Sequence, residues 1–309
     1  MECARKEASG GRVPGSFRDP SGFVFIHKNE VFRALSSEFA TLYRELLAPK
    51  VLPELFDAGL MVETSLVFDD ALCDELSSLY PGYRDFVRHS KVSFINYPCE
   101  WSFSMLADAA LHTLDLQTKL LTHGLALKDA TPYNIQFVDG KPIFIDLTSI
   151  EKPHTMNVWY AMGQFYQMFL YPLLLSRFRG VDFRSYFLGE IGGRSLEQVV
   201  QQFSTLDLFR PSLILDLSLP YWLQRRHERK RDTVSKPLAV STDPKAQLLN
   251  LNRLKNKIKK LRNSIKANSA WSEYTLICNY TEQAEEAKKQ AVASFLEAKR
   301  QQTVLDVGC

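Results

Sequence analysis

Two carboxylates and one amide are spaced along residues 127–149 so that a short hairpin would gather them at one edge. Asp139-Gly140 is a strong signal for a two-residue turn, and it lies between two β-prone runs. Such a tight turn sets the register of the two strands. Counting back from the turn places Asn134 diagonal to Asp146 at the open end of the hairpin. We therefore expect two oxygen-bearing side chains to meet there.

Asp129 lies five residues before Asn134, in a loop held by Pro132 that could fold back over the same edge. Hard cations such as Mg²⁺ take carboxylate and amide oxygens and share their remaining positions with substrate phosphates. Together with Asp146, these residues predict a site for Mg²⁺ and phosphate. The alternative is an ordinary hairpin with acids at its solvated ends, because Asp-x4-Asn is a short pattern of residue types that are common in loops.

The spacing of Asp129 and Asn134, followed by a strand that ends in Asp146, resembles the catalytic loop and metal-binding Asp of protein-kinase-like phosphotransferases. The resemblance implies that Asp129 orients an acceptor hydroxyl, whereas Asn134 and Asp146 hold the metal. The upstream sequence has the expected order, with a strand at 91–96, a hinge-like break and then an amphipathic helix at 101–123.

The loop departs from the kinase pattern at three places. Leu127 replaces the usual histidine, Lys128 replaces an arginine, and Leu147-Thr148 replaces the Phe-Gly that follows the metal Asp. These departures leave the metal pair intact. We assign Lys128 to the cofactor-binding side of the site.

The N-terminal part reads as a reduced lobe. A hairpin is expected over residues 22–35, and residues 39–57 are expected to be helical despite two prolines. The lobe has no glycine-rich phosphate loop and no obvious strand lysine. Arg33 could substitute for the lysine in binding a cofactor, with Glu45 or Glu54 as its partner; the alternative is a surface arginine on an edge strand.

The segment TVLDVGC at 303–309 reads as an apolar strand that closes on an acid and a glycine. It resembles the opening of the first S-adenosylmethionine motif in Rossmann-like methyltransferases, where a strand delivers a glycine-rich turn beside the cofactor. By this resemblance, Asp306 and Gly308 would contact S-adenosylmethionine. The segment then predicts a methyltransferase domain cut at its first strand.

Five stretches together carry a wider resemblance: DPSGFVF at 19–25, YPCEWSFSMLADAAL at 97–111, HGLALKDATPYNIQF at 123–137, PIFIDLTSIE at 142–151, and WSEY with NYT at 271–281. They resemble the bacterial methyltransferases of the nodulation-protein type, which carry a kinase-like region ahead of the methyltransferase domain. The resemblance implies that the complete protein uses S-adenosylmethionine and that the methyltransferase domain acts in cis with this region.

Composition narrows the class of protein. At 309 residues and 45% hydrophobic, the chain can form a two-lobed domain with a large core plus an extension. Its five cysteines show neither close pairs nor metal-ligand spacing, which we interpret as reduced thiols of a cytoplasmic protein. The apolar segment 158–175 is interrupted by Gln164, Gln167 and Pro172, so we expect a buried helix and no membrane span. A net charge of +3 is too small to imply a nucleic-acid partner.

We expect an α+β fold, with a two-lobed protein-kinase-like body followed by a helical extension that leads into a truncated Rossmann-like methyltransferase domain. The expected parts are a disordered lead at 1–16, the kinase-like domain at 17–223, a linker at 224–246, the helical extension at 247–302 and the severed strand at 303–309. An apolar stripe predicts one amphipathic helix in the extension; its members are Leu251, Leu254, Ile258, Leu261 and Ile265. Its lysines, Lys257 and Lys260 among them, are interpreted as a solvated face, in preference to a membrane-surface or nucleic-acid helix.

Three functional interpretations stay open. The first is methyl transfer by the complete protein to a small polar or carbohydrate-like acceptor, which the kinase-like part presents or modifies. The second is an active phosphotransferase that uses Mg²⁺ and ATP. The third is a pseudokinase-like binding module without chemistry. The intact Asp129, Asn134 and Asp146 favour the second over the third, whereas the missing glycine-rich loop and strand lysine favour the third.

Overall fold

The computed structural model describes all residues except 1–10, 17–18, 157, 229–243, 265–280 and 300–309. It is an α+β protein in which helices take up more of the described chain than strands. The chain forms two compact units, residues 1–264 and residues 265–309. The second unit contains helix α14 (Glu282–Lys299). No helix in the described ranges is long and apolar enough to cross a bilayer.

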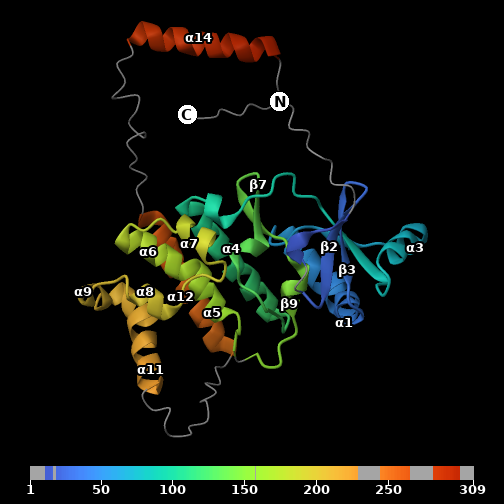
Figure 1. The fold of residues 1–309 in the computed structure, drawn as a ribbon, viewed down its shortest axis with the longest axis horizontal. Helices are drawn as coiled ribbons and strands as arrows, with labels where there is room; N and C mark the ends of the chain where they lie inside the picture. The colour runs from blue at the N-terminus through green and yellow to red at the C-terminus, as the bar shows by residue number, and fades with distance from the viewer. Residues whose placement is uncertain (1–10, 17–18, 157, 229–243, 265–280, 300–309) are drawn as a thin grey trace. The chain divides into compact units, whose positions relative to one another are not determined.

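A five-stranded antiparallel sheet forms the N-terminal part of the first unit (Figure 1). In spatial order its strands are β1 (Gly11–Arg12), β2 (Gly22–His27), β3 (Glu30–Leu35), β5 (Asp85–His89) and β4 (Thr64–Leu66). The turn between β2 and β3 runs through Lys28 and Asn29, whose φ angles of 47° and 64° suit a two-residue type I′ turn. The predicted hairpin at residues 22–35 is therefore confirmed.

The two faces of this sheet differ because directly paired residues point to the same side. One face is apolar and packs with helix α3 (Asp70–Leu79); its core residues are Phe23, Phe25, Phe32, Ala34, Val67, Leu76 and Phe86. The other face carries the pairs Val24 with Arg33 and Val31 with His89. Arg33 and His89 are buried. A buried guanidinium on an interior strand therefore faces away from the apolar core beneath α3.

The segment after β3 is helical as far as residue 57, as predicted. It consists of α1 (Ser37–Leu42), the π-helical stretch η2 (Tyr43–Val51) and α2 (Leu52–Asp57). Pro49 lies inside the π-helical stretch. Proline lacks the N–H that an α-helix needs, and the wider turn accommodates it without ending the helix.

Helix α4 (Phe103–Thr122) leads into the loop that carries the candidate site. The Ser102 hydroxyl caps the start of the helix by accepting the N–H of Met105, and Gly124 follows its end with φ of 70°. The predicted helix over 101–123 is confirmed.

The hairpin after this loop has the predicted register. Strands β7 (Ile135–Val138) and β8 (Lys141–Phe144) pair with Val138 opposite Lys141. Asp139 and Gly140 both have positive φ, as the tight turn requires. Strand β6 (Ala126–Leu127) pairs with β9 (Ile150–Glu151), so the chain before and after the hairpin is joined. We call residues 126–151 the hairpin platform.

The remaining helices of the first unit follow the hairpin platform in the chain. They are α5 (Met162–Phe165), η6 (Tyr166–Leu170), α6 (Tyr171–Arg179), α7 (Arg184–Gly189), α8 (Leu196–Val200), α9 (Thr205–Leu208), α10 (Pro211–Leu213), η7 (Ile214–Ser218), α11 (Leu219–Glu228) and α12 (Pro244–Ser264). The buried helix predicted within 158–175 is confirmed, since α5, η6 and α6 run through it and residues 168–175 are buried. The predicted linker at 224–246 overlaps both α11 and the start of α12.

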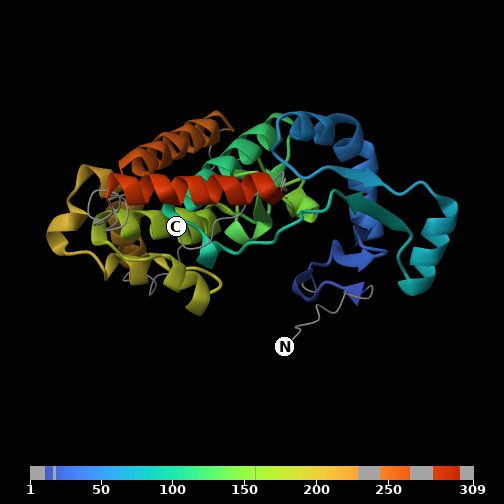
Figure 2. The ribbon, with the colours of Figure 1, turned by 90° about the horizontal axis from the view of Figure 1, so that it is seen from above.

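Helix α12 packs against α4 and α6 (Figure 2). Four members of its predicted apolar stripe are buried: Leu251, Leu254, Ile258 and Leu261. The fifth, Ile265, lies outside the described residues. This helix therefore belongs to the same core as α4.

The interpretation of the α12 lysines as a solvated face is wrong for two of them. Lys257 pairs with the buried Asp216, and Lys255 pairs with Asp115 at 2.7 Å. The two lysine side chains are 16% and 15% exposed. Lys260 is exposed, as predicted. A lysine of α12 is partly buried where an acid on a neighbouring helix pairs with it. The helical spacing of the lysines alone does not predict the positions of these acids.

Two further expectations differ from the structure. The strand predicted at 91–96 is a loop, and the strand that pairs with β3 is the preceding β5. The loop is held by the Asn96 N–H, which donates to the Gln136 side chain at 2.9 Å. Residues 11–12 and 14–16, part of the predicted disordered lead at 1–16, have regular structure, since β1 pairs with β2 and a 3₁₀ turn follows.

Candidate functional site

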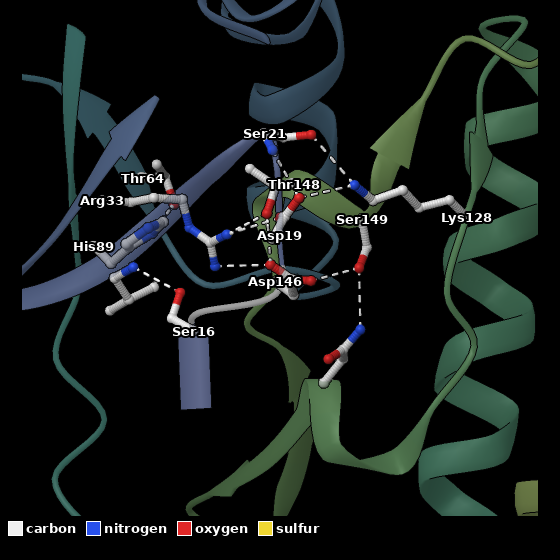
Figure 3. A network of polar contacts seen from close by, with 12 residues as sticks. Ser16, Asp19, Ser21, Arg33, Thr64, His89, Lys128, Asp146, Thr148 and Ser149 are labelled. Carbon is white, nitrogen blue, oxygen red and sulfur yellow. Dashed lines mark hydrogen bonds and ion pairs between the residues drawn. The ribbon is translucent and has the colours of Figure 1, made fainter. Parts of the chain in front are cut away.

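The guanidinium of Arg33 joins the N-terminal sheet to the hairpin platform (Figure 3). Its Nη2 lies 2.7 Å from Oδ1 of Asp146, and the arginine side chain is 6% exposed. The surface position considered for Arg33 is wrong, because β3 lies between β2 and β5. The predicted pairing with Glu45 or Glu54 is also wrong, because Arg33 forms ion pairs with Asp146 of the platform and with Asp19 of the β1–β2 connection.

Both oxygens of Asp146 accept hydrogen bonds inside the protein. Oδ1 accepts from the Thr148 hydroxyl at 2.9 Å as well as from Arg33, and Oδ2 accepts from the Ser149 hydroxyl at 2.5 Å. Ser149 in turn accepts a bond from the amide nitrogen of Asn134 at 3.1 Å. Burial opposes ionisation of Asp146, but Arg33 and the two hydroxyls outweigh it and hold the pKa of this carboxyl below its usual range. The residues predicted as a metal pair are thus connected through a hydroxyl.

A second acid, Asp19, reaches the site from the connection between β1 and β2. Its Oδ1 accepts from Lys128 Nζ at 3.2 Å and from the backbone N–H of Ser21 at 2.9 Å. Its Oδ2 lies 3.7 Å from Arg33 Nη1. Lys128 also donates to the Ser21 hydroxyl at 3.3 Å. Figure 3 shows Asp19 facing the two cations of the site.

Asp129 differs from the other two acids. No hydrogen bond or ion pair to its carboxylate occurs among the described residues, whereas the next residue, Ala130, is anchored by its N–H to the Gln164 side chain at 2.6 Å. Burial raises the pKa of Asp129, and the charges of Asp146 and Asp19 raise it further against the opposing effect of Lys128. Asp129 is therefore a carboxylate in a fixed loop whose oxygens are available to a ligand.

His89 lies beside Arg33 on the same face of the sheet. The Thr64 hydroxyl donates to the Val62 carbonyl, so in its 2.8 Å contact with His89 Nδ1 the hydroxyl accepts and the imidazole donates. Burial, with the nearby Arg33 charge, lowers the pKa of His89 to about 3, so the ring is neutral. His89 Nε2 and Arg33 Nε are both buried without a hydrogen-bond partner among the described residues.

The site gathers five residues that the sequence singled out: Arg33, Lys128, Asp129, Asn134 and Asp146. The other two candidates, Asp306 and Gly308, lie outside the described residues. The roles predicted for all seven residues stay predictions.

Sequence reasoning missed Asp19, Thr148 and Ser149 as members of the site. A signal was present for Asp19, because Asp-Pro-Ser-Gly at 19–22 is a strong turn pattern whose acid caps its own turn. Thr148 and Ser149 follow Asp146 directly, where short hydroxyl side chains commonly bond back to a nearby carboxylate. Neither signal identifies the residues far away in the sequence with which these side chains interact.

The donor set as arranged does not fit a divalent cation. Among the described residues, no group of three or more His, Cys, Asp or Glu side chains is placed to hold a metal. Asn134 turns its amide nitrogen toward Ser149, and Asp146 is committed to Arg33 and two hydroxyls. The carboxylate and the amide predicted to bind Mg²⁺ are therefore bonded to protein groups in this structure.

The chain is similar over most of its length to a curated bacterial protein. It is 34% identical over 301 residues to nodulation protein NoeA of Rhizobium meliloti (strain 1021), an alignment that covers 97% of this chain. The chain spans 62% of the length of that relative. No protein-family model matches the chain. This chain is thus similar to a nodulation protein over nearly all of its own length.

Proposed function

We propose that this region is a kinase-like module that binds the polar acceptor of a longer, S-adenosylmethionine-dependent methyltransferase. The observation that carries the proposal is the contrast among the acids of the site. Asp146 and Asp19 are paired within the protein, whereas the carboxylate of Asp129 has no partner among the described residues.

The order of the elements supports a kinase-like arrangement. An antiparallel sheet comes first, helix α4 follows, and then come the Asp129 loop and the β7–β8 hairpin that ends near Asp146. In protein kinases the loop Asp accepts the proton of the substrate hydroxyl. Asp129 stands at that place in this chain, and a free carboxylate can accept a hydrogen bond from a hydroxyl or an ammonium group.

Methyl transfer belongs to the complete protein in this proposal. The chain spans 62% of the relative's length, so 100 − 62 = 38% of the relative lies outside the matched part. A domain that binds S-adenosylmethionine is proposed for the rest of the longer protein, on the resemblance of residues 303–309 to a cofactor-binding strand. The kinase-like module would then present a small polar or carbohydrate-like acceptor to that domain.

A methyl-transfer assay with the longest natural protein that carries this region tests the proposal. Labelled S-adenosylmethionine is supplied with a polar extract of the source cells, and transfer is compared for the wild type, Asp129→Asn and Asp139→Asn. Asp139 is an exposed acid of the hairpin turn and serves as the matched control. We expect Asp129→Asn to lose transfer at least tenfold while S-adenosylmethionine still binds. Unchanged transfer in Asp129→Asn would refute the proposed role.

An active phosphotransferase is the second candidate. The observation that favours it is the connection of Asn134 to Asp146 through Ser149, which keeps both predicted metal ligands at one end of the hairpin. This function predicts Mg²⁺-dependent hydrolysis of ATP or transfer of its terminal phosphate, with loss of turnover in Asp129→Asn. An assay for phosphate release with and without Mg²⁺ separates it from the acceptor-binding module.

A further inference from the structure

The guanidinium of Arg33 lies against the Asp146 carboxylate, which the sequence predicts to bind Mg²⁺. Arg33 Nη2 lies 2.7 Å from Asp146 Oδ1, and the Ser149 hydroxyl holds the other oxygen at 2.5 Å. Mg²⁺ needs oxygen ligands at about 2.0–2.1 Å in near-octahedral geometry. A cation on the same carboxylate competes for these lone pairs and repels the metal at short range. Because Arg33 is almost fully buried, this competitor does not leave by a simple side-chain rotation into solvent.

The carboxylate of Asp19 lies beside Arg33 and Lys128, the two cations that could bind a phosphate. In protein kinases a glycine-rich loop covers the phosphates and a strand lysine binds them. In this chain the connection between β1 and β2 delivers Asp19, whose oxygens lie 3.2 Å from Lys128 and 3.7 Å from Arg33. The two cations that could bind a phosphate therefore already face an anion of the protein.

The charge balance of the site also disfavours a nucleotide. Two cations, Arg33 and Lys128, stand against three acids, Asp19, Asp129 and Asp146, so the sum is 2 − 3 = −1 with all five ionised. A polyphosphate adds negative charge to such a site. A ligand that donates hydrogen bonds meets a free acceptor in Asp129.

We propose that Arg33 and Asp19 are a built-in cation and anion that replace Mg²⁺ and a phosphate. The site then takes a ligand with hydroxyl or ammonium groups at Asp129, and it does so without a divalent metal or a nucleotide. This inference rests on the kinase-like arrangement proposed above and does not depend on methyl transfer.

Manganese binding to the 309-residue chain tests the inference, because free Mn²⁺ is counted directly by its paramagnetic resonance signal. We expect the wild type and Asp146→Asn to give the same weak titration curve up to millimolar Mn²⁺. Arg33→Met removes the guanidinium and keeps an apolar side chain of similar length. It should gain one Mn²⁺ site at least tenfold tighter than any in the wild type, and the double variant Arg33→Met with Asp146→Asn should lose it again.

Two results would overturn the inference: saturable Mn²⁺ binding by the wild type that Asp146→Asn abolishes, or a folded Arg33→Met variant that gains no site. If Arg33→Met does not fold, the comparison of the wild type with Asp146→Asn decides alone, since equal curves support the inference and unequal curves contradict it. Thermal melting of the wild type with ATP and Mg²⁺ adds a second readout, for which we expect no shift. Acceptor binding through Asp129 is measured separately, so its failure is distinguishable from failure here.

Discussion

Replacing Lys257 with glutamine tests whether the buried ion pair between Lys257 and Asp216 stabilises the packing of α12 on the rest of the first unit. Asp216, from the helical stretch η7, is 1% exposed. Its Oδ1 accepts from the Tyr166 hydroxyl at 3.0 Å and lies 2.9 Å from Arg253, while its Oδ2 is paired with Lys257. Lys257→Gln removes one of the two cations and leaves the acid buried.

The expected cost follows from that geometry. Removing the partner of a buried charge typically costs about 3–5 kcal/mol when nothing else compensates the charge. Arg253 and Tyr166 still bond to Asp216 after the change, so we expect the lower figure of about 1–3 kcal/mol. For a unit of this size each kcal/mol shifts Tm by about 2–4 °C, so a loss near 2 kcal/mol lowers Tm by about 4–8 °C.

The assay is thermal unfolding followed by circular dichroism at constant pH, with urea unfolding as an independent measure of free energy. Lys260→Gln is the matched control, because Lys260 is on the same helix and exposed. Its Tm should stay within about 2 °C of the wild type, since surface substitutions usually change stability by no more than about 0.5 kcal/mol. Equal Tm values for Lys257→Gln and Lys260→Gln would show that Lys257 lies on the solvated face of α12 with Lys260.

Three other predictions follow from burial, titration and backbone geometry. Ile258→Asp places a charge in the core between α12 and its neighbours and should lower the free energy of unfolding by several kcal/mol. The measurement is urea unfolding, in which the midpoint should fall steeply or the cooperative transition should be lost. The pKa of His89 falls from 6.5 to about 3 on folding, so the unfolded chain binds a proton at a higher pH than the folded protein does. The free energy of unfolding should therefore decline as the pH falls from 6.5 toward 3. The difference in this free energy between the wild type and His89→Gln, measured across that window, isolates the effect. Gly22→Ala would place a Cβ in steric conflict with the Ala34 carbonyl oxygen and should destabilise far more than Gly59→Ala, whose Cβ meets nothing within 4 Å, although both glycines have positive φ.

Local patterns in the sequence predicted the hairpin platform well, because a two-residue turn sets the register of its own strands. The same reasoning predicted the β2–β3 hairpin and the buried stripe of α12. It did not find the partner of Arg33, since Asp146 is 146 − 33 = 113 residues away and the contact depends on how the sheet lies against the platform. Lys257 was missed for the same reason, because its acid lies on a different helix.

Ligand binding at Asp129 tests directly whether this site takes a polar acceptor without a metal. Ligand-observed NMR with glycerol, glucose and glucosamine as probes compares the wild-type 309-residue chain with Asp129→Asn and with the control Asp139→Asn, each with and without Mg²⁺. We expect the wild type and Asp139→Asn to bind at least one probe, Mg²⁺ to have no effect, and Asp129→Asn to lose binding. Binding that persists in Asp129→Asn, or that requires Mg²⁺, would contradict it.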